Sequence, residues 1–175
     1  MHPLLAELER RASDDGVAAV PRATGRFLAT IVTAMQANRI LEVGTGYGYA
    51  TLWMALAQPS VGRIWTIEPE IARTDVARSF FERAAEDDFI EVFNTPALEL
   101  LENFPHRNLD IVVVSAEPRE YDAYLELMVP MLKLSGLAIF TGAHAAPEFV
   151  RRFLTHEALV STLLPLGVLI GARRQ

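Results

Sequence analysis

The chain of 175 residues contains no cysteine. Disulfide bonds, thiolate metal sites and a cysteine nucleophile are therefore excluded. Long hydrophobic runs are also missing, since none approaches the roughly 20 residues that span a bilayer. The first residues are charged and lack the order of a signal peptide. We therefore expect a cytoplasmic protein that does not enter a membrane.

Lysine is nearly absent, because Lys133 is the only lysine among the 16 basic residues. Lys133 closes a segment with helical spacing, so the one candidate for a catalytic lysine is expected at an ordinary helix end. The formal net charge is −6 and the isoelectric point is about 5.2. Binding of nucleic-acid phosphates needs a basic face, so the charge argues against a nucleic acid as the main partner.

Short apolar runs alternate along the chain with segments of helical spacing. The runs at residues 39–44, 63–68, 89–94, 109–115 and 137–141 predict buried strands. Two further runs around Pro165 and Gly167 predict a closing antiparallel hairpin. The pattern predicts an α/β fold with a doubly wound, mostly parallel seven-stranded sheet. We expect a single domain over residues 1–175, with a helical segment at 1–37 and an α/β core at 38–175.

The stretch ILEVGTGYGYAT, residues 40–51, places three glycines between a predicted strand and a predicted helix. Gly44, Gly46 and Gly48 allow a tight turn and the close approach of a ligand to the backbone. A dinucleotide fingerprint needs glycine or alanine five residues after its first glycine, where Tyr49 or Thr51 stands. The Gly-Lys-Ser/Thr of a Walker A loop does not follow either. A phosphate-cradling role is disfavoured, and a strand–helix turn without a ligand remains an alternative.

Glu68 ends the next predicted strand. A carboxylate at this position can accept hydrogen bonds from both hydroxyls of a ribose, although an exposed acid without a role is the alternative. Glu42 precedes the first glycine by two residues. An acid, a glycine loop and a second acid in this order suggest the binding of a nucleoside that carries no pyrophosphate.

These segments resemble the S-adenosylmethionine site of class I methyltransferases, on ILEVGTGYGYATLWMA and GRIWTIEPE. The resemblance narrows to the catechol and caffeoyl-coenzyme-A O-methyltransferase group on EVFNTPALELL, on the stretch LDIVVVSAEPREYDAYLELMVPMLKLSGLAIF and on LLPLGVLIGARR. It runs from about residue 17 to the end. It implies a Rossmann-like methyltransferase fold and transfer of a methyl group to a small-molecule acceptor, at oxygen. It also suggests a homodimer. The first helix is amphipathic, with Leu4, Leu5 and Leu8 on one side, and it closes over the cofactor, pairs with a second copy or packs on its own domain.

The resemblance also implies which residues hold the cofactor. They are Glu42, Gly44, Thr45, Gly46, Gly48, Tyr49, Ala50, Glu68, Pro69, Thr95, Pro96, Ala97, Ser115 and Ala116. The glycine loop would line the methionine part, and the helix start at Tyr49 would favour its carboxylate. Glu68 would hold the ribose, residues 95–97 would border the adenine that Pro69 flanks, and Ser115 would lie beneath the sulfonium.

The sequence departs from the group at its metal ligands. Relatives that use a divalent cation carry an Asp after the fourth strand and an Asp-Asn pair after the fifth, where this chain has Ser115, Thr141 and Gly142. A hard cation needs charged or carbonyl oxygens in number, so no metal is expected. Pro118 replaces a lysine that often acts as base, and Pro96 replaces an acid that often contacts the adenine.

Three interpretations follow from these departures. The chain is a metal-independent methyltransferase, in which His144 or Glu117 acts as base, although each could also be a loop residue without a role. Alternatively it binds S-adenosylmethionine without catalysis, as a sensor or partner module, or it has lost the cofactor. An NAD-linked reductase is an alternative from another enzyme class, and the missing fifth-position glycine counts against it.

Overall fold

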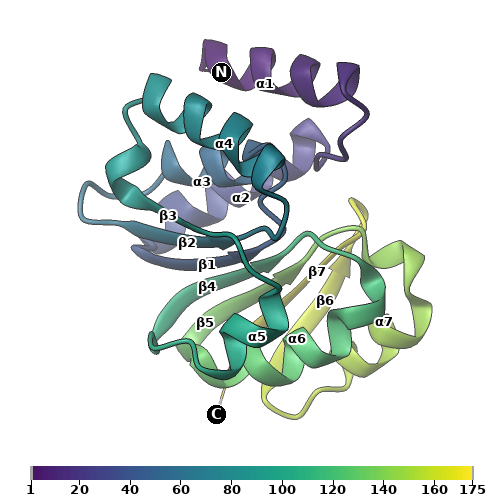
Figure 1. The fold of residues 1–175 in the computed structure, drawn as a ribbon. Coiled ribbons are helices and arrows are strands. Elements are labelled where there is room, and N and C mark those ends of the chain that lie inside the picture. The colour runs from purple at the N-terminus through teal and green to yellow at the C-terminus, as the bar shows by residue number, and fades with distance from the viewer. Residues whose placement is uncertain (1, 175) are drawn as a thin grey trace.

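The computed structural model describes residues 2–174, which form one seven-stranded sheet in the order β3-β2-β1-β4-β5-β7-β6 (Figure 1). The first five strands pair in parallel, and β7 runs antiparallel to both β5 and β6. The strands are β1 (Arg39–Val43), β2 (Arg63–Ile67), β3 (Ile90–Phe93), β4 (Leu109–Val114), β5 (Leu132–Phe140), β6 (Leu159–Leu164) and β7 (Val168–Arg173). This order confirms the predicted doubly wound sheet and its terminal hairpin.

The helices cover both faces of the sheet, with α1 to α4 on one face and α5 to α7 on the other (Figure 1). The α-helices are α1 (Pro3–Asp14), α2 (Arg22–Met35), α3 (Tyr49–Ala55), α4 (Ile71–Arg83), α5 (Ala97–Glu102), α6 (Tyr121–Met128) and α7 (Pro147–Leu154). Short 3₁₀ turns are η1 (Asp87–Phe89), η2 (Pro118–Glu120), η3 (Val129–Met131) and η4 (Ala143–Ala145). None of the helices within residues 2–174 is long and apolar enough to cross a membrane.

The strands are apolar along their length because both faces of the sheet are buried. Successive residues of a strand point to opposite faces, so Ile40 packs in the α1–α4 layer and Leu41 in the α5–α7 layer. Every residue of β4 is buried, including Asp110. This arrangement explains why the strands appear in the sequence as continuous apolar runs rather than as alternating ones.

The prediction that Lys133 closes a helix is wrong, because it lies in β5. Pro130 falls in η3, directly before the strand begins at Leu132. The pairing of β5 with β4 shifts register between Leu132 and Leu137, so the early part of the strand is irregular and lacks a recognisable strand pattern. The Lys133 ammonium forms an ion pair with the Asp110 carboxylate, which also accepts the backbone N–H groups of residues 38 and 39.

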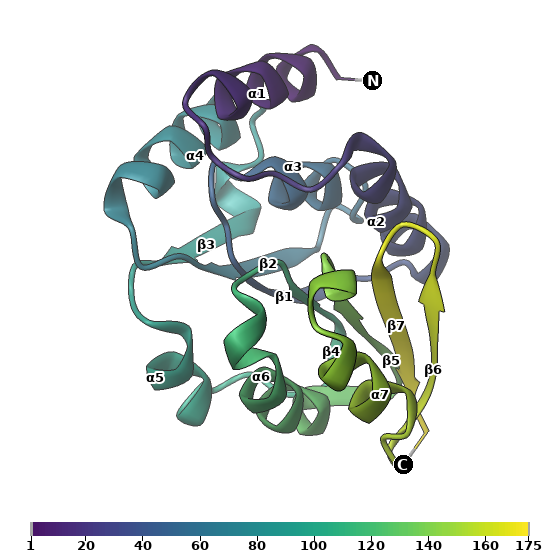
Figure 2. The same ribbon diagram turned by 90° about the vertical axis from the view of Figure 1, so that its right-hand side faces the viewer.

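The first helix packs on its own chain, as one of the three interpretations of the sequence predicts. Leu5 and Leu8 are buried in the same apolar layer as α2, α3 and α4. On its outer side, Glu7 forms an ion pair with Arg83 of α4, with a shortest N–O distance of 2.7 Å. The segment that joins α1 to α2 then passes close to α3 and the loop before it (Figure 2).

Candidate functional site

The strand order reverses between β1 and β4, which are neighbours in the sheet although β2 and β3 lie between them in the chain. In open α/β sheets, ligands bind outside the carboxyl ends of the strands at such a reversal. The loop at residues 44–48, Glu68 and Ser115 all follow these strand ends, so the structure brings together the principal residues that the sequence singled out.

The glycine loop, residues 44–48, has its three glycines in the left-handed backbone region, with φ of +95° at Gly44, +52° at Gly46 and +82° at Gly48. A Cβ on Gly44 would lie 2.3 Å from the carbonyl oxygen of Ser115, and one on Gly48 would lie 2.6 Å from the Phe81 ring. A Cβ on Gly46 would come no closer than 3.8 Å to a neighbouring atom. Packing thus accounts for two of the glycines, whereas the space beside Gly46 is free.

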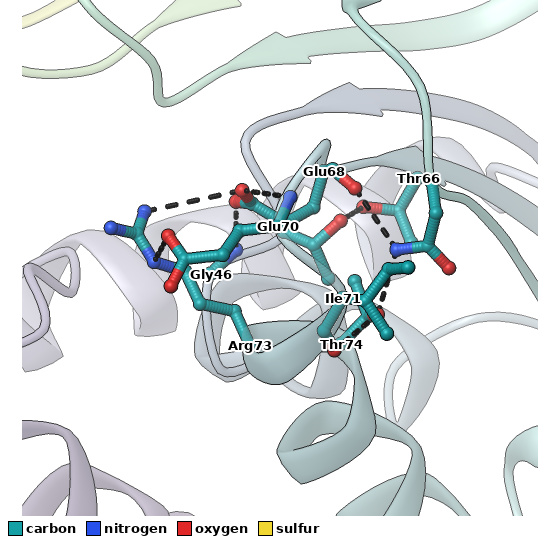
Figure 3. Close-up of polar contacts among 9 residues, drawn as sticks. Gly46, Thr66, Glu68, Glu70, Ile71, Arg73 and Thr74 are labelled. Atoms are coloured by element: carbon teal, nitrogen blue, oxygen red, sulfur yellow. Dashed lines mark hydrogen bonds and ion pairs between the residues drawn. The ribbon is translucent and has the colours of Figure 1, made fainter.

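The Glu68 carboxylate lies against the glycine loop (Figure 3). Its Oε2 accepts the backbone N–H of Gly46 at 3.0 Å, and its Oε1 accepts the N–H of Glu70 at 3.2 Å. The guanidinium of Arg73 stands 3.9 Å from Oε1 and is bound mainly to Glu70, at 2.9 Å. Glu68 is only 6% exposed. The two backbone N–H groups hold its carboxylate at one edge of the loop.

Asn94 joins the ends of β2 and β3, which places residues 95–97 beside Glu68. Its amide nitrogen donates to the Glu68 carbonyl oxygen at 3.1 Å and to the Thr74 hydroxyl at 2.7 Å. The Glu68 N–H donates to the carbonyl oxygen of Phe93 at 3.0 Å. Among the expected adenine neighbours, Pro69, Thr95 and Pro96 are at least partly exposed, whereas Ala97 is buried at the start of α5.

Glu42 lies beneath the loop and has no exposed surface. Its Oε2 accepts hydrogen bonds from the hydroxyls of Thr51, at 2.5 Å, and Thr66, at 2.6 Å. The Thr66 hydroxyl also bonds to that of Thr45 in the glycine loop, at 2.6 Å. Burial raises the pKa of Glu42 to about 7, although the two hydroxyls act to lower it. The carboxyl group is therefore tied through hydroxyls to β2, α3 and the glycine loop.

Neutral oxygens occupy the ends of β4 and β5. The Thr141 hydroxyl donates to the Ser115 hydroxyl at 3.0 Å, and the Tyr121 hydroxyl donates to the Thr141 carbonyl oxygen at 2.7 Å. Within residues 2–174, no group of three or more His, Asp or Glu side chains is arranged to hold a metal ion. Two hydroxyls that bond to each other do not fit the donor set of a hard cation.

The two candidate bases lie on exposed loops. His144 belongs to η4 and packs on the hairpin turn, since its Nδ1 is 2.6 Å from where a Cβ on Gly167 would stand. Glu117 follows β4, and its charge adds to the burial that raises the pKa of Tyr121 to about 12. Among the described residues, no hydrogen bond joins either side chain to the glycine loop, so their catalytic role stays a prediction.

Sequence reasoning missed the contact between the glycine loop and the N-terminal segment. The Tyr47 hydroxyl donates to Asp15 Oδ2 at 2.8 Å, and Arg11 Nε donates to the same oxygen at 2.7 Å. The carbonyl oxygen of Ala18 is the atom nearest to the free side of Gly46. Asp15 and Tyr47 are 32 positions apart, and no motif links them.

A surface groove of about 400 Å³ lies elsewhere, between α1 and α4. Arginines and acids line it, among them Arg10, Asp14 and Arg83. It shares no residue with the glycine loop or with Glu68. We therefore place the candidate site at the loops that follow the strand ends rather than in this groove.

Comparison with known proteins adds the family. A family model described as O-methyltransferase matches residues 1–145. A catechol O-methyltransferase from Mycobacterium tuberculosis (strain ATCC 25618 / H37Rv) is 31% identical over 121 residues, which cover 69% of this chain and 55% of that protein. A caffeoyl-CoA O-methyltransferase from Populus kitakamiensis is 32% identical over 125 residues, which cover 69% and 53%. The chain thus spans about half the length of these curated relatives.

A solved structure has the same fold over nearly the whole chain. It is the O-methyltransferase from Bacillus cereus in complex with SAH, with a TM-score of 0.84 and 23% sequence identity. The match covers 99% of this chain and 92% of that one. It confirms the methyltransferase fold that the sequence predicts.

Proposed function

The chain belongs to the O-methyltransferase family, and from this premise we propose that it transfers a methyl group from S-adenosylmethionine to a hydroxyl oxygen of a small acceptor without a metal ion. The observation that carries the proposal is the Glu68 carboxylate, fixed by backbone N–H groups at the edge of a loop whose central glycine, Gly46, leaves open space. A buried acid beside free backbone is suited to a ribose, because two hydroxyls can donate to one carboxylate.

Each part of the site has a binding task in this proposal. Glu68 accepts the ribose hydroxyls, and residues 95–97 with Pro69 border the adenine. The loop backbone at residues 44–48 and the start of α3 at Tyr49 and Ala50 receive the methionine part, whose carboxylate is favoured by the helix N-terminus. Ser115 and Ala116 close the site beneath the sulfur. When bound, the cofactor supplies a methyl group on a positively charged sulfur.

The metal-independent part of the proposal is supported by the neutral hydroxyls of Ser115 and Thr141 at the ends of β4 and β5, which do not suit a hard cation. Orientation of the acceptor oxygen toward the methyl carbon can supply much of the rate, because methyl transfer needs alignment of the two reacting atoms. As the bond from carbon to the acceptor oxygen forms and the bond to sulfur breaks, the hydroxyl proton must leave. We assign its removal to His144 or Glu117, on the loops that follow β5 and β4.

Calorimetric titration of the purified chain with S-adenosylmethionine and S-adenosylhomocysteine tests the proposal. We expect micromolar affinity that is the same with magnesium and with EDTA. No binding at millimolar ligand would overturn the proposal. Binding without product from a panel of small phenols and alcohols would favour the non-catalytic module, and stabilisation by NADH alone in a thermal-shift assay would favour a reductase.

The base is tested separately. Replacing His144 by asparagine should slow turnover at least tenfold and leave the affinity for S-adenosylhomocysteine unchanged, because general bases typically contribute about 100-fold or more. Glu117→Gln is measured in parallel as the alternative base, and the variant that slows turnover identifies which of the two residues removes the proton. An unchanged rate in both variants would remove both residues from the reaction.

We also propose that two copies of the chain pair through the β6 edge. Val160, Leu163 and Leu166 are exposed on β6 and its turn, at 64%, 41% and 42%. An edge strand with exposed apolar side chains is a site at which another chain can pair. Sedimentation of the wild type and of Val160→Lys checks the pairing, and a monomeric wild type would exclude it.

A further inference from the structure

Glu42 holds a polar atom that the fold leaves without a partner. Its Oε2 has two hydroxyl donors, whereas its Oε1 is buried and bonds to no described residue. A buried polar atom without a hydrogen bond destabilises a protein, and the cost is larger for a charged group. Within the described part of the chain no cation balances a charge on Glu42, and its hydroxyl contacts use Oε2 alone, so they do not account for the buried Oε1.

The position of Glu42 connects it to the site. It lies two residues before Gly44, and its hydroxyl contacts continue through Thr66 to Thr45, inside the glycine loop. A charge on Glu42 therefore lies directly beneath the loop that would receive the methionine part of the cofactor. The side chain is 0% exposed, so bulk solvent does not reach this position. Charges interact more strongly across such a medium than at the surface, and salt screens them less.

We propose that the buried Glu42 carboxyl is the group by which the site distinguishes its cationic cofactor from the product. The inference rests on the proposed function. Methyl transfer converts a sulfonium into a neutral thioether, so cofactor and product differ by one methyl group and one positive charge. Hydroxyls and backbone amides of the loop treat both ligands alike. Both ligands also carry the amino group of their methionine part, so an anionic carboxylate beneath the loop attracts that group equally in both. The sulfonium adds an attraction that only the cofactor has, which favours binding of the cofactor and release of the product.

The groups around Glu42 allow its charge to change near neutral pH. Burial is the largest influence and favours the protonated form, and the charge of Glu68 at the end of β2 acts in the same direction. The hydroxyls of Thr51 from α3 and Thr66 from β2 oppose them. From β4, the register neighbour is the apolar Val113. A bound cation stabilises the ionised form, so the preference for the cationic ligand should grow as the pH rises through the pKa of Glu42.

The test is calorimetric titration of the wild type and of Glu42→Gln with S-adenosylmethionine and with S-adenosylhomocysteine, between about pH 5 and about pH 9. In the wild type, the ratio of the two affinities should rise about tenfold toward high pH, which corresponds to a change of about one pKa unit in Glu42 on binding the cation. In Glu42→Gln the rise should vanish. The ligands' own amino groups titrate in both proteins, so their effect cancels in the comparison.

A second variant keeps the test decisive if Glu42→Gln does not fold. Thr66→Val keeps the shape of the side chain and removes one hydroxyl that lowers the pKa of Glu42, so the midpoint of the rise should move to higher pH. Asp110→Asn is the matched control, because Asp110 is a buried acid near the opposite end of the neighbouring strand and should leave the midpoint unchanged.

The outcomes separate the two claims. Failure of the wild type to bind either ligand overturns the proposed function. Binding with a ratio that does not change with pH overturns the role of Glu42 and leaves the proposed function intact. An equal rise in the wild type and in Glu42→Gln, or a midpoint that Thr66→Val does not move, also overturns the role of Glu42.

Discussion

Replacing Glu68 by glutamine should weaken the binding of S-adenosylhomocysteine by about 1.5 kcal/mol, roughly tenfold. The magnitude follows from the surroundings of the carboxylate. Hydrogen bonds to a charged group contribute about 1.5–3 kcal/mol, and the substitution replaces one charged acceptor oxygen with an amide donor. We use the lower end of this range because Glu68 already accepts hydrogen bonds from the N–H groups of Gly46 and Glu70. The ribose hydroxyls would therefore replace part of this existing hydrogen bonding and would not only add new bonds.

Calorimetry at constant pH measures this change, and Glu70→Gln is the matched control. Glu70 is the neighbouring acid on the same turn, its side chain is 54% exposed, and its partner is Arg73 rather than the loop. An exposed ion pair of this kind contributes at most about 1 kcal/mol, so the control should bind nearly as the wild type does. If Glu68→Gln bound as tightly as the wild type, Glu68 would not be the ribose acceptor.

Three further substitutions, with Arg151→Met as a control for one of them, test the structure. Gly44→Ala should destabilise the fold by about 2 kcal/mol or more in urea unfolding, because the new Cβ would meet the backbone oxygen of Ser115 at 2.3 Å; equal stability would refute the loop geometry. The pKa of Glu42 in the folded chain, about 7, exceeds the ordinary 4.5, so its protonated form stabilises the fold below about pH 4.5 and this contribution is lost as the pH rises through 7. Between about pH 4.5 and pH 7, the free energy of unfolding of Glu42→Gln should therefore fall by up to about 3 kcal/mol less than that of the wild type. If the two proteins had identical pH profiles of unfolding, the charge of Glu42 would not be buried. Lys133→Met leaves Asp110 with backbone partners alone and should cost about 1–2 kcal/mol, reduced because Lys133 is half exposed, whereas Arg151→Met on the surface of α7 should cost almost nothing.

The sequence predicted the parts of the fold whose pattern is local. Apolar runs such as β4 are buried on both faces, and the glycine loop and Glu68 occupy strand ends, where parallel strands place their carboxyl ends together. Lys133 was misassigned because Leu125, Met128 and Leu132 keep a helical spacing across the helix end, and only tertiary pairing with β4 decides that the chain becomes a strand.

Contacts between distant segments could not be predicted. The hydroxyl pair of Ser115 and Thr141, the bond from Tyr47 to Asp15 and the position of Phe81 against Gly48 each depend on how helices and loops pack over the sheet. The sequence could mark Gly44 and Gly48 as unusual. It could not distinguish a glycine required by a neighbouring atom from Gly46, which borders open space.

The bond between Tyr47 and Asp15 fastens the N-terminal connection to the glycine loop. Asp15 and its partner Arg11 are accessible to solvent, with side chains 33% and 56% exposed, so ionic strength acts on this contact more than on the buried hydroxyls below it. Segments held by surface contacts open locally far more often than the core unfolds. If the glycine loop holds a nucleoside, as proposed, local opening of residues 15–21 would expose that side of the loop, and we expect the rate of ligand exchange to depend on salt even where the affinity does not.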